Sequence, residues 1–301
     1  MIPVYNAEGS LEPLARRLGS ALSPLEWEAI FVNDGSADRS WDVVRTLAAA
    51  EPRVRGLNLM RNYGQHNALL AGIRAARGDI VITMDDDLQH PPEAIHALLA
   101  ELDRGFDVVY GSPIRLPHSR LRNAASWLTK LVLARTMGAE TARRISAFRA
   151  FRCRLRKAFE GYGSPFVSID VVLTWGTRRF SHVPVEHSAR ASGESNYTFR
   201  SLVSHAITVA TGFSTLPLRL ASLLGFLFTL LGLAVLIFVV VTFFVRGGSV
   251  PGFPFLASIV AIFSGAQLFA LGILGEYLAR VHLRSMERPT YAIADAVGTP
   301  E

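Results

Sequence analysis

The sequence predicts an α/β domain built on a parallel sheet, followed by a hairpin of two membrane-spanning helices. Short apolar runs alternate with helical segments through the first 110 residues. This alternation is typical of a parallel sheet that is covered on both faces. Two long apolar stretches then follow, at residues 218–246 and 253–279. Each exceeds the ~20 residues that a helix needs to cross a bilayer.

The elements of the first domain follow from the apolar spacing and the turn residues between the runs. We expect strands at residues 2–5, 29–32, 54–59, 80–84, 108–110 and 180–187, and helices at residues 11–22, 40–50, 94–102 and 167–175, with another that ends near residue 76. The apolar run at the start of the chain resembles the end of a strand. We therefore expect either that the first strand is short or that its beginning lies upstream of Met1.

Three adjacent aspartates, Asp85, Asp86 and Asp87, come directly after the apolar run 80–84, and a proline pair then opens a helix. Ligands in open α/β sheets bind at this carboxyl end of the strands. Neighbouring carboxylates repel one another, and a hard divalent cation with oxygen ligands offsets that repulsion best. The alternative is a solvated acidic turn. With a cation, the motif predicts a metal-assisted transferase that uses a nucleotide-linked donor.

A second acidic turn, residues 33–36, follows the strand at 29–32. Asp34 could accept a hydrogen bond from a base or a ribose hydroxyl, as acidic residues do in other nucleotide folds. The alternative is an Asx turn with Gly35 at a positive φ angle. The sequence contains neither the glycine-rich dinucleotide motif nor a phosphate-binding P-loop, which disfavours those two nucleotide-binding classes.

The charge and cysteine content narrow the class of partner. The net charge of +6 suits nucleic acid, anionic lipid or a phosphorylated substrate. Arginines and aromatic residues interleave between residues 115 and 156, a mixture that single-stranded nucleic acid could use, although most of these arginines are expected on solvated helix faces. The single cysteine, Cys153, excludes an internal disulfide and suits a reducing compartment.

The two apolar stretches predict a transmembrane hairpin, preceded by an amphipathic helix at residues 197–217 that either lies in the membrane interface or caps the domain. Basic residues lie mainly outside the hairpin: Arg219 before it, Arg280, Arg284 and Arg288 after it, and only Arg246 in its turn. The positive-inside rule therefore places the large domain and the tail at residues 280–301 in the cytoplasm.

Four glycines in the hairpin could let helices approach closely, either between copies of the chain in a homo-oligomer or within one hairpin. They are Gly225, Gly232, Gly265 and Gly272.

Seven short motifs occur in one order along nearly the whole chain. They are residues 3–6 (PVYN), 32–36 (VNDGS), 61–64 (RNYG), 85–93 (DDDLQHPPE), 148–152 (FRAFR), 190–195 (RASGES) and 275–278 (GEYL). In this set the chain resembles the family 2 glycosyltransferases with a GT-A (Rossmann-like) fold. Among them it is most similar to the polyprenyl-phosphate glycosyltransferases, the group of dolichol-phosphate mannose synthase and the undecaprenyl-phosphate sugar transferases.

The resemblance implies an inverting, multi-pass enzyme of the inner membrane that moves a sugar from a UDP- or GDP-sugar to a polyprenyl phosphate, with Mg²⁺ or Mn²⁺ as cofactor. It implies donor-binding roles for Pro3, Tyr5, Asn6, Glu8, Asp34, Gly64, Asp85 and Asp86. It implies metal ligands at Asp85, Asp87 and Gln89, and catalytic roles for Asp87, Arg149 and Arg190. It implies contacts with the acceptor phosphate for Arg120, Arg122, Arg149, Arg190 and Ser195.

The chain departs from the family pattern at three positions: Ala7 separates Asn6 from Glu8, Asn196 replaces a basic residue, and Ala147 replaces an aspartate before the Phe-Arg pair. The last departure removes a possible general base, but an acceptor phosphate is already anionic at pH 7 and needs none. We expect Asp170 to be a surface helix residue that could at most orient the sugar.

Three alternatives remain at this point. A processive polysaccharide synthase fits less well, because only two spans are predicted and the Gln-x-x-Arg-Trp acceptor motif is missing. A catalytically silent membrane scaffold could bind nucleotide sugar or recruit a flippase, but it has no need for three adjacent carboxylates. A nucleic-acid binder would show strong salt-dependent binding, and the hairpin disfavours it.

Overall fold

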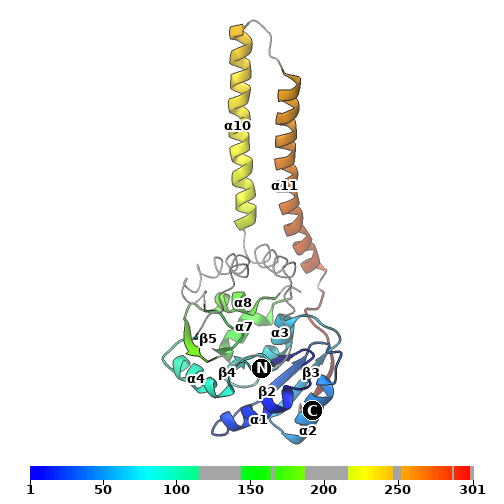
Figure 1. Cartoon of the computed structure of the whole chain (residues 1–301), viewed down its shortest axis with the longest axis vertical. Coiled ribbons are helices and arrows are strands. Elements are labelled where there is room, and N and C mark those ends of the chain that lie inside the picture. The colour runs from blue at the N-terminus through cyan, green and yellow to red at the C-terminus, as the bar shows by residue number, and fades with distance from the viewer. Residues whose placement is uncertain (115–143, 164–166, 187–215, 247–251, 287, 299–301) are drawn as a thin grey trace. The chain divides into compact units, whose positions relative to one another are not determined.

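The computed structural model describes residues 1–114, 144–163, 167–186, 216–246, 252–286 and 288–298. The described residues before 187 form one compact unit with residues 288–298, and the helical residues 216–286 form a second unit. Figure 1 labels helices and strands of both units.

The first unit contains two four-stranded sheets. In the first sheet, β1 (Ile2–Val4), β2 (Ala29–Asn33) and β3 (Val54–Leu59) run parallel, and β8 (Ile293–Val297) adds to β3 in the antiparallel direction. Strand β1 borders the second sheet, because Met84 N donates to Met1 O at 3.2 Å just beyond the end of β4 (Ile80–Thr83). The carboxyl ends of β1, β2 and β4 therefore lie near one another.

The second sheet has the order β4, β6 (Arg149–Arg152), β5 (Val108–Pro113) and β7 (Phe180–Val185). Strand β6 is antiparallel to both of its neighbours, whereas β5 and β7 are parallel. The predicted α/β class is therefore confirmed, but the sheets are mixed rather than wholly parallel.

Helices cover both faces of the first sheet, as the sequence predicts. Phe31 of β2 points into an apolar cluster with residues of α1 (Leu11–Ala21) and α2 (Ser40–Ala50), whereas its neighbour Val32 points toward α3 (Gln65–Ala75). This follows from the two-residue period of a strand. Helix α4 (Ile95–Asp103), entered through the 3₁₀ turn η1 (Pro92–Ala94), packs on the second sheet. The short turn η2 (Cys153–Arg156), α7 (Lys157–Glu160) and α8 (Ile169–Gly176) complete this unit.

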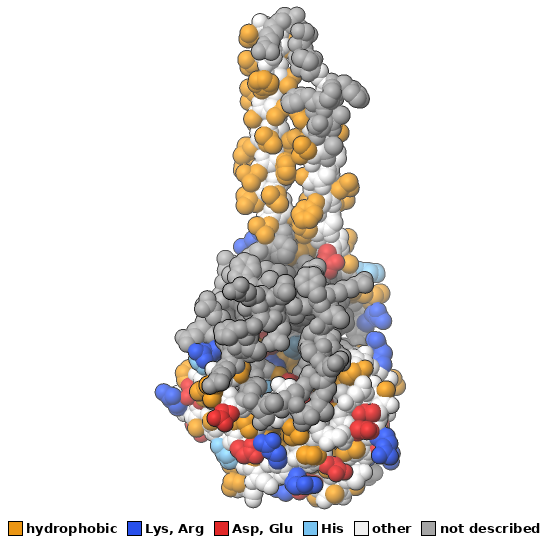
Figure 2. Space-filling model, viewed as in Figure 1, with side chains coloured by type: hydrophobic (Ala, Val, Ile, Leu, Met, Phe, Trp, Pro, Cys, Tyr) orange, Lys and Arg blue, Asp and Glu red, His pale blue; other side chains and the backbone are white. Residues whose placement is uncertain are grey.

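The second unit is a helical hairpin of α10 (Leu216–Arg246) and α11 (Phe253–Ser285). Segments Leu218–Val245 and Ile262–Leu283 are long and apolar enough to cross a membrane, and neither is buried within the protein. Figure 2 shows hydrophobic side chains spread over the surface of both helices. The two predicted apolar helices are therefore confirmed, and α11 extends beyond the expected end at residue 279.

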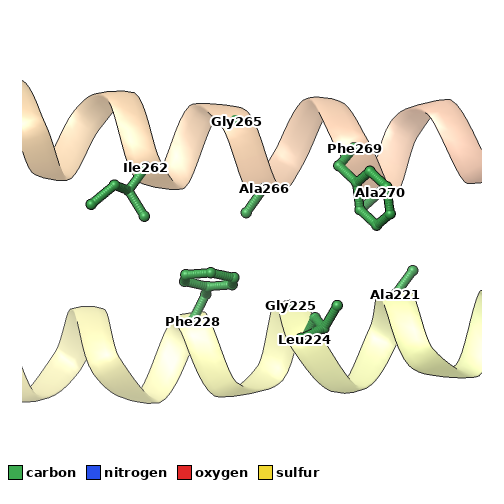
Figure 3. A pocket seen from close by; sticks show the side chains of 9 residues that line it. All are labelled: Ala221, Leu224, Gly225, Phe228, Ile262, Gly265, Ala266, Phe269 and Ala270. Atoms are coloured by element: carbon green, nitrogen blue, oxygen red, sulfur yellow. The ribbon is translucent and has the colours of Figure 1, made fainter.

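The two helices leave an apolar cavity of about 260 Å³ between them (Figure 3). Small residues on both helices line it, including Gly225, Gly265 and Ala266. Gly232, by contrast, sits against a ring, because a Cβ there would lie 3.0 Å from Phe263 Cζ. Phe263 also packs edge-on against Phe228. Among the four glycines, Gly232 is thus the one used for packing within the hairpin, since a Cβ at the other three meets nothing described within 4 Å.

The sequence does not predict two of the strands, β6 and β8. Strand β6 lies in the arginine-rich part of the chain, where no strand was expected, and it separates β4 from β5. Strand β8 lies in the region expected to be only a tail, residues 280–301, and returns to the first sheet. There Gly56 makes room for it, since a Cβ on Gly56 would lie 2.8 Å from Val297 Cγ2. The predicted helix at residues 197–217 falls mostly outside the described residues.

Candidate active site at the carboxyl ends of the strands

The three aspartates lie where the sequence predicts, in the loop immediately after β4. This loop is tightly folded, because Leu88 adopts a positive φ of 62°, an uncommon conformation for a residue with a branched side chain. The turn lets Gln89 fold back on Asp87: Gln89 N donates to Asp87 Oδ1 at 3.2 Å, and Gln89 Nε2 donates to Asp87 Oδ2 at 2.6 Å. Gln89 therefore fixes the orientation of the Asp87 carboxylate.

The pKa of the Asp85 carboxyl is raised by its surroundings. Its removal from water, and then the charges of Asp87 and Asp86, raise its pKa to about 6, against smaller opposing effects of Arg149 and Gln65. Gln65, at the start of α3, donates from Nε2 to Asp85 Oδ1 at 2.7 Å. Asp86 points elsewhere, since its Oδ2 accepts Tyr5 N at 3.1 Å. The Asp86 carboxylate therefore binds the loop after β1, and Asp85 and Asp87 lie on either side of Asp86 in the sequence.

A divalent cation fits this loop chemically. Repulsion that raises the pKa of Asp85 is what a bound cation would relieve, and carboxylate oxygens are the ligands that Mg²⁺ and Mn²⁺ prefer. Within the described residues, no group of three His, Cys, Asp or Glu side chains converges closely enough to hold a metal unaided. Asp85 and Asp87 would thus supply two ligands, and oxygens of a bound substrate or water would supply the rest.

Asp34 directly follows β2 as predicted, but it is buried and its carboxylate binds the backbone of the chain itself. Its Oδ1 accepts Tyr63 N at 2.7 Å and its Oδ2 accepts Gly64 N at 2.9 Å. Burial raises the pKa of Asp34, and these two N–H groups oppose the rise. Gly64 adopts a φ of 92°, which only glycine takes without strain, and α3 begins directly after it. Asp34 therefore sets the loop that leads into α3.

Two other predicted donor-binding residues, Asn6 and Glu8, tie the β1 loop to the start of α2. The Asn6 amide oxygen accepts Ala37 N at 2.8 Å, and Asn6 N donates to Ser36 Oγ at 3.0 Å. Glu8 Oε2 accepts Arg39 N at 3.0 Å, next to the first turn of α2. Both side chains thus have a structural use.

Pro3 and Tyr5, which flank the end of β1, differ in their access to solvent. Pro3 is buried within β1, whereas Tyr5 is 49% exposed. Of this pair, therefore, only Tyr5 offers its side chain to a ligand.

Arg149, for which the sequence predicts a contact with the acceptor phosphate, is buried. Its side chain is 3% exposed and forms an ion pair with Asp170 of α8. Its Nε also donates to Thr83 Oγ1 at 3.0 Å, and Tyr110 OH donates to Asp170 Oδ1 at 2.9 Å. The prediction that Asp170 lies on the surface is therefore wrong, since this residue is 9% exposed. A carboxylate inside the apolar run of residues 169–173 was the signal that could have shown it.

The remaining predicted residues, Arg120, Arg122, Arg190 and Ser195, lie outside the described residues.

Comparison with protein families decides the class of the chain. Residues 1–163 match the model of the family described as glycosyl transferase family 2. The chain belongs to glycosyltransferase family 2. The predicted family resemblance is confirmed, and the acidic end of β4 belongs to a glycosyltransferase.

Relatives in this family align over almost the whole chain. A protein of Shewanella sediminis named undecaprenyl-phosphate 4-deoxy-4-formamido-L-arabinose transferase is 36% identical over 98% of this chain and 91% of its own length. A protein of the same name from Klebsiella pneumoniae is 35% identical over 100% of this chain and 94% of its own length. Both alignments include the helical hairpin.

A solved glycosyltransferase-like fold is also similar to this chain, at lower sequence identity. A crystal structure of glucosyl-3-phosphoglycerate synthase from Mycobacterium tuberculosis, in complex with Mn²⁺, UDP and phosphoglyceric acid, has a TM-score of 0.52. It is 18% identical and covers 70% of this chain and 74% of its own. The likeness shows the GT-A type of α/β fold.

Proposed function

We propose that this glycosyltransferase moves a sugar from a UDP- or GDP-sugar to a polyprenyl phosphate, with Mg²⁺ or Mn²⁺, at the cytoplasmic face of the inner membrane. The observation that carries the proposal is the end of β4, where Asp85 and Asp87 lie together and the pKa of Asp85 is raised to about 6 in a family 2 domain. The names of relatives that align with the whole chain support an undecaprenyl-phosphate acceptor.

The donor would bind across the carboxyl ends of β1, β2 and β4. Tyr5 is exposed there and is proposed to contact the base. Asp34 shapes the loop of Tyr63 and Gly64, and that loop would border the ribose. Asp85 and Asp87 would hold the metal, and Gln89 would keep Asp87 oriented. When bound, the metal supplies positive charge to the diphosphate leaving group.

The acceptor step needs charge neutralisation and alignment more than proton transfer. A phosphate acceptor is already anionic at pH 7, so no general base is required. Arg120, Arg122, Arg190 and Ser195 are proposed to face the acceptor phosphate, because two anions must approach each other. Arg149 would act from within the domain, as a buried positive charge behind the acidic loop. As expected for an inverting enzyme, an α-linked donor would give a β-linked product.

The hairpin is proposed to keep the domain at the membrane, where the lipid phosphate lies. Segments Leu218–Val245 and Ile262–Leu283 have the length and composition for this. The distribution of arginines supports a cytoplasmic domain: Arg219, Arg280, Arg284 and Arg288 lie at or beyond the outer ends of α10 and α11, and only Arg246 lies at the turn between them.

The test uses the full chain purified in detergent with Mg²⁺ and undecaprenyl phosphate. A panel of UDP- and GDP-sugars, including the UDP-linked 4-deoxy-4-formamido-L-arabinose suggested by the relatives' names, is screened by mass spectrometry for lipid-linked sugar. We expect product with one donor and none in EDTA. Metal-dependent nucleotide binding without product from any donor would favour the silent scaffold instead.

A further inference from the structure

A network of buried hydrogen bonds lies next to the acidic loop. It joins the three strands β4, β5 and β6 with helix α8. Arg149 of β6 pairs with Asp170 of α8, Tyr110 of β5 donates to the same Asp170 oxygen, and Thr83 of β4 accepts from Arg149. Thr83 in turn donates to Ala147 O at 2.7 Å. All four side chains belong to residues that are at most 9% exposed. A bare ion pair in such a place adds little stability, so this one invites a functional explanation.

Arg149 lies beside the end of β4 that leads into the Asp85 loop. Thr83 and Arg149 are register partners in neighbouring strands, and the Thr83 hydroxyl accepts from Arg149 Nε. Asp85 follows Thr83 by two residues, just beyond the end of β4. The charge of Arg149 is felt at Asp85: it lowers the pKa of Asp85, against the larger effects that raise it.

Arg149 nevertheless makes no hydrogen bond to Asp85. Its guanidinium donates instead to Asp170 and to Thr83. A guanidinium that turned toward Asp85 would form a two-pronged bond to its carboxylate, because the planar fork of arginine matches a carboxylate. That bond would occupy the lone pairs that a divalent cation needs.

We propose that Asp170 is a positioning residue that holds the Arg149 guanidinium away from Asp85, so that Asp85 stays open to the divalent cation. The inference rests on the proposed metal-dependent transfer. Tyr110 orients Asp170 through its hydroxyl, and Thr83 holds the other side of the guanidinium. Arg149 then acts as a fixed counter-charge rather than as a competitor for the metal site. Asp85 is the other carboxylate whose charge raises the pKa of Arg149, so a guanidinium without Asp170 would be drawn toward it.

The test is binding of Mn²⁺ to the full chain with saturating UDP, followed by electron paramagnetic resonance of the free ion. We expect Asp170→Asn to weaken Mn²⁺ binding about tenfold or more, the range seen when a residue that supports a metal ligand is changed. The double variant Arg149→Met with Asp170→Asn removes the competitor, and we expect it to regain most of that affinity. A purely structural role for the pair predicts no such recovery.

A kinetic measurement separates positioning from direct chemistry. In Asp170→Asn, the Mn²⁺ concentration that gives half the maximal rate should rise about tenfold, while kcat at saturating Mn²⁺ stays within about threefold of wild type. A kcat that falls a hundredfold with unchanged Mn²⁺ binding would overturn the inference, because Asp170 would then act on a reacting group. Wild-type Mn²⁺ affinity in Asp170→Asn would also overturn it.

Tyr110→Phe provides the test if Asp170→Asn does not fold. It removes only the hydroxyl that donates to Asp170 and keeps the ring that fills the core. We expect a weakening of Mn²⁺ binding of about threefold, and an unchanged affinity would contradict the inference. Failure of the proposed function looks different: the wild-type chain itself would bind no Mn²⁺ with UDP and would form no product.

Discussion

The carboxylate of Asp34 at the end of β2 receives the backbone N–H of Gly64 at 2.9 Å, across thirty residues of sequence. A second N–H, from Tyr63, reaches the other carboxylate oxygen at 2.7 Å. The aspartate that resembles a nucleotide-binding residue is therefore also the group that fixes the start of α3. This double use makes Asp34 the residue at which fold and proposed donor site are most closely coupled.

Replacing Asp34 with asparagine should lower both the stability of the fold and the affinity of the proposed donor site. The amide keeps one acceptor oxygen but turns an NH₂ group toward a backbone donor, so a partly buried N–H loses its hydrogen bond to residue 34. We expect a loss of about 1–3 kcal/mol in the free energy of unfolding and weaker UDP or GDP binding, measured by thermal unfolding in detergent with and without nucleotide. A variant with wild-type stability would show that the two hydrogen bonds contribute little.

Glu28 links the domain's stability to pH. Its Oε2 pairs with the buried Arg55 at 2.7 Å, and its Oε1 accepts Arg77 N at 2.6 Å. Burial raises the pKa of Glu28, but these partners together lower it below the ordinary 4.5. A lowered acid pKa stabilises the fold above the unfolded-state pKa, and that contribution is lost as the pH falls through the folded-state pKa.

We therefore expect Glu28→Gln to destabilise the domain by about 1–3 kcal/mol at pH 7, and the difference from wild type to shrink below about pH 4.5. Melting temperatures at several pH values measure this. Glu93→Gln is the matched control, because its pair with Arg17 has the same short distance but is exposed to solvent. A difference that stays constant down to pH 3 would contradict the assigned sign.

Strand β8 can be tested at the glycine that makes room for it. A Cβ on Gly56 would lie 2.5 Å from Val44 Cγ1 and 2.8 Å from Val297 Cγ2, so Gly56→Ala should overpack this contact and cost about 1–3 kcal/mol. Gly19→Ala in α1 is the control, because nothing lies within 4 Å of a Cβ there, and it should stabilise by about 0.5–1 kcal/mol. Equal melting temperatures for the two variants would argue against the close packing of α2 and β8 around Gly56.

The hairpin offers a similar comparison. A Cβ on Gly232 meets Phe263, whereas one on Gly225 meets nothing within 4 Å. Gly232→Leu should therefore lower the melting temperature in detergent, and Gly225→Leu should leave it nearly unchanged. Size-exclusion chromatography with light scattering adds a second reading. If Gly225 instead packs between copies of the chain, its leucine variant will change the oligomeric state.

The sequence was informative where a strand ends in a polar loop. An apolar run that stops at Asp34 or Asp85 defines both the strand and the side chains at its carboxyl end, and the structure places these residues at the ends of β2 and β4. Local signals are sufficient there, because the loop residues follow the strand directly.

Features that depend on distant partners were missed. Strand β6 carries arginines at both ends, and only its place between β4 and β5 explains why Arg149 is buried. Strand β8 is short and mostly exposed, and its sequence, IADAV, does not alternate between apolar and polar residues. The sequence alone predicts a surface position for Asp170, because its partner, Arg149, lies 21 residues earlier in the chain.

The measurement that tests the central claim most directly compares the wild-type chain with Asp87→Asn in sugar transfer from nucleotide sugar to undecaprenyl phosphate. We expect the wild type to form lipid-linked product that EDTA abolishes and Mg²⁺ restores, and the folded, membrane-bound variant to form none. Transfer at the wild-type rate by Asp87→Asn, or full wild-type transfer in EDTA, would contradict the assignment of the acidic loop as the metal site.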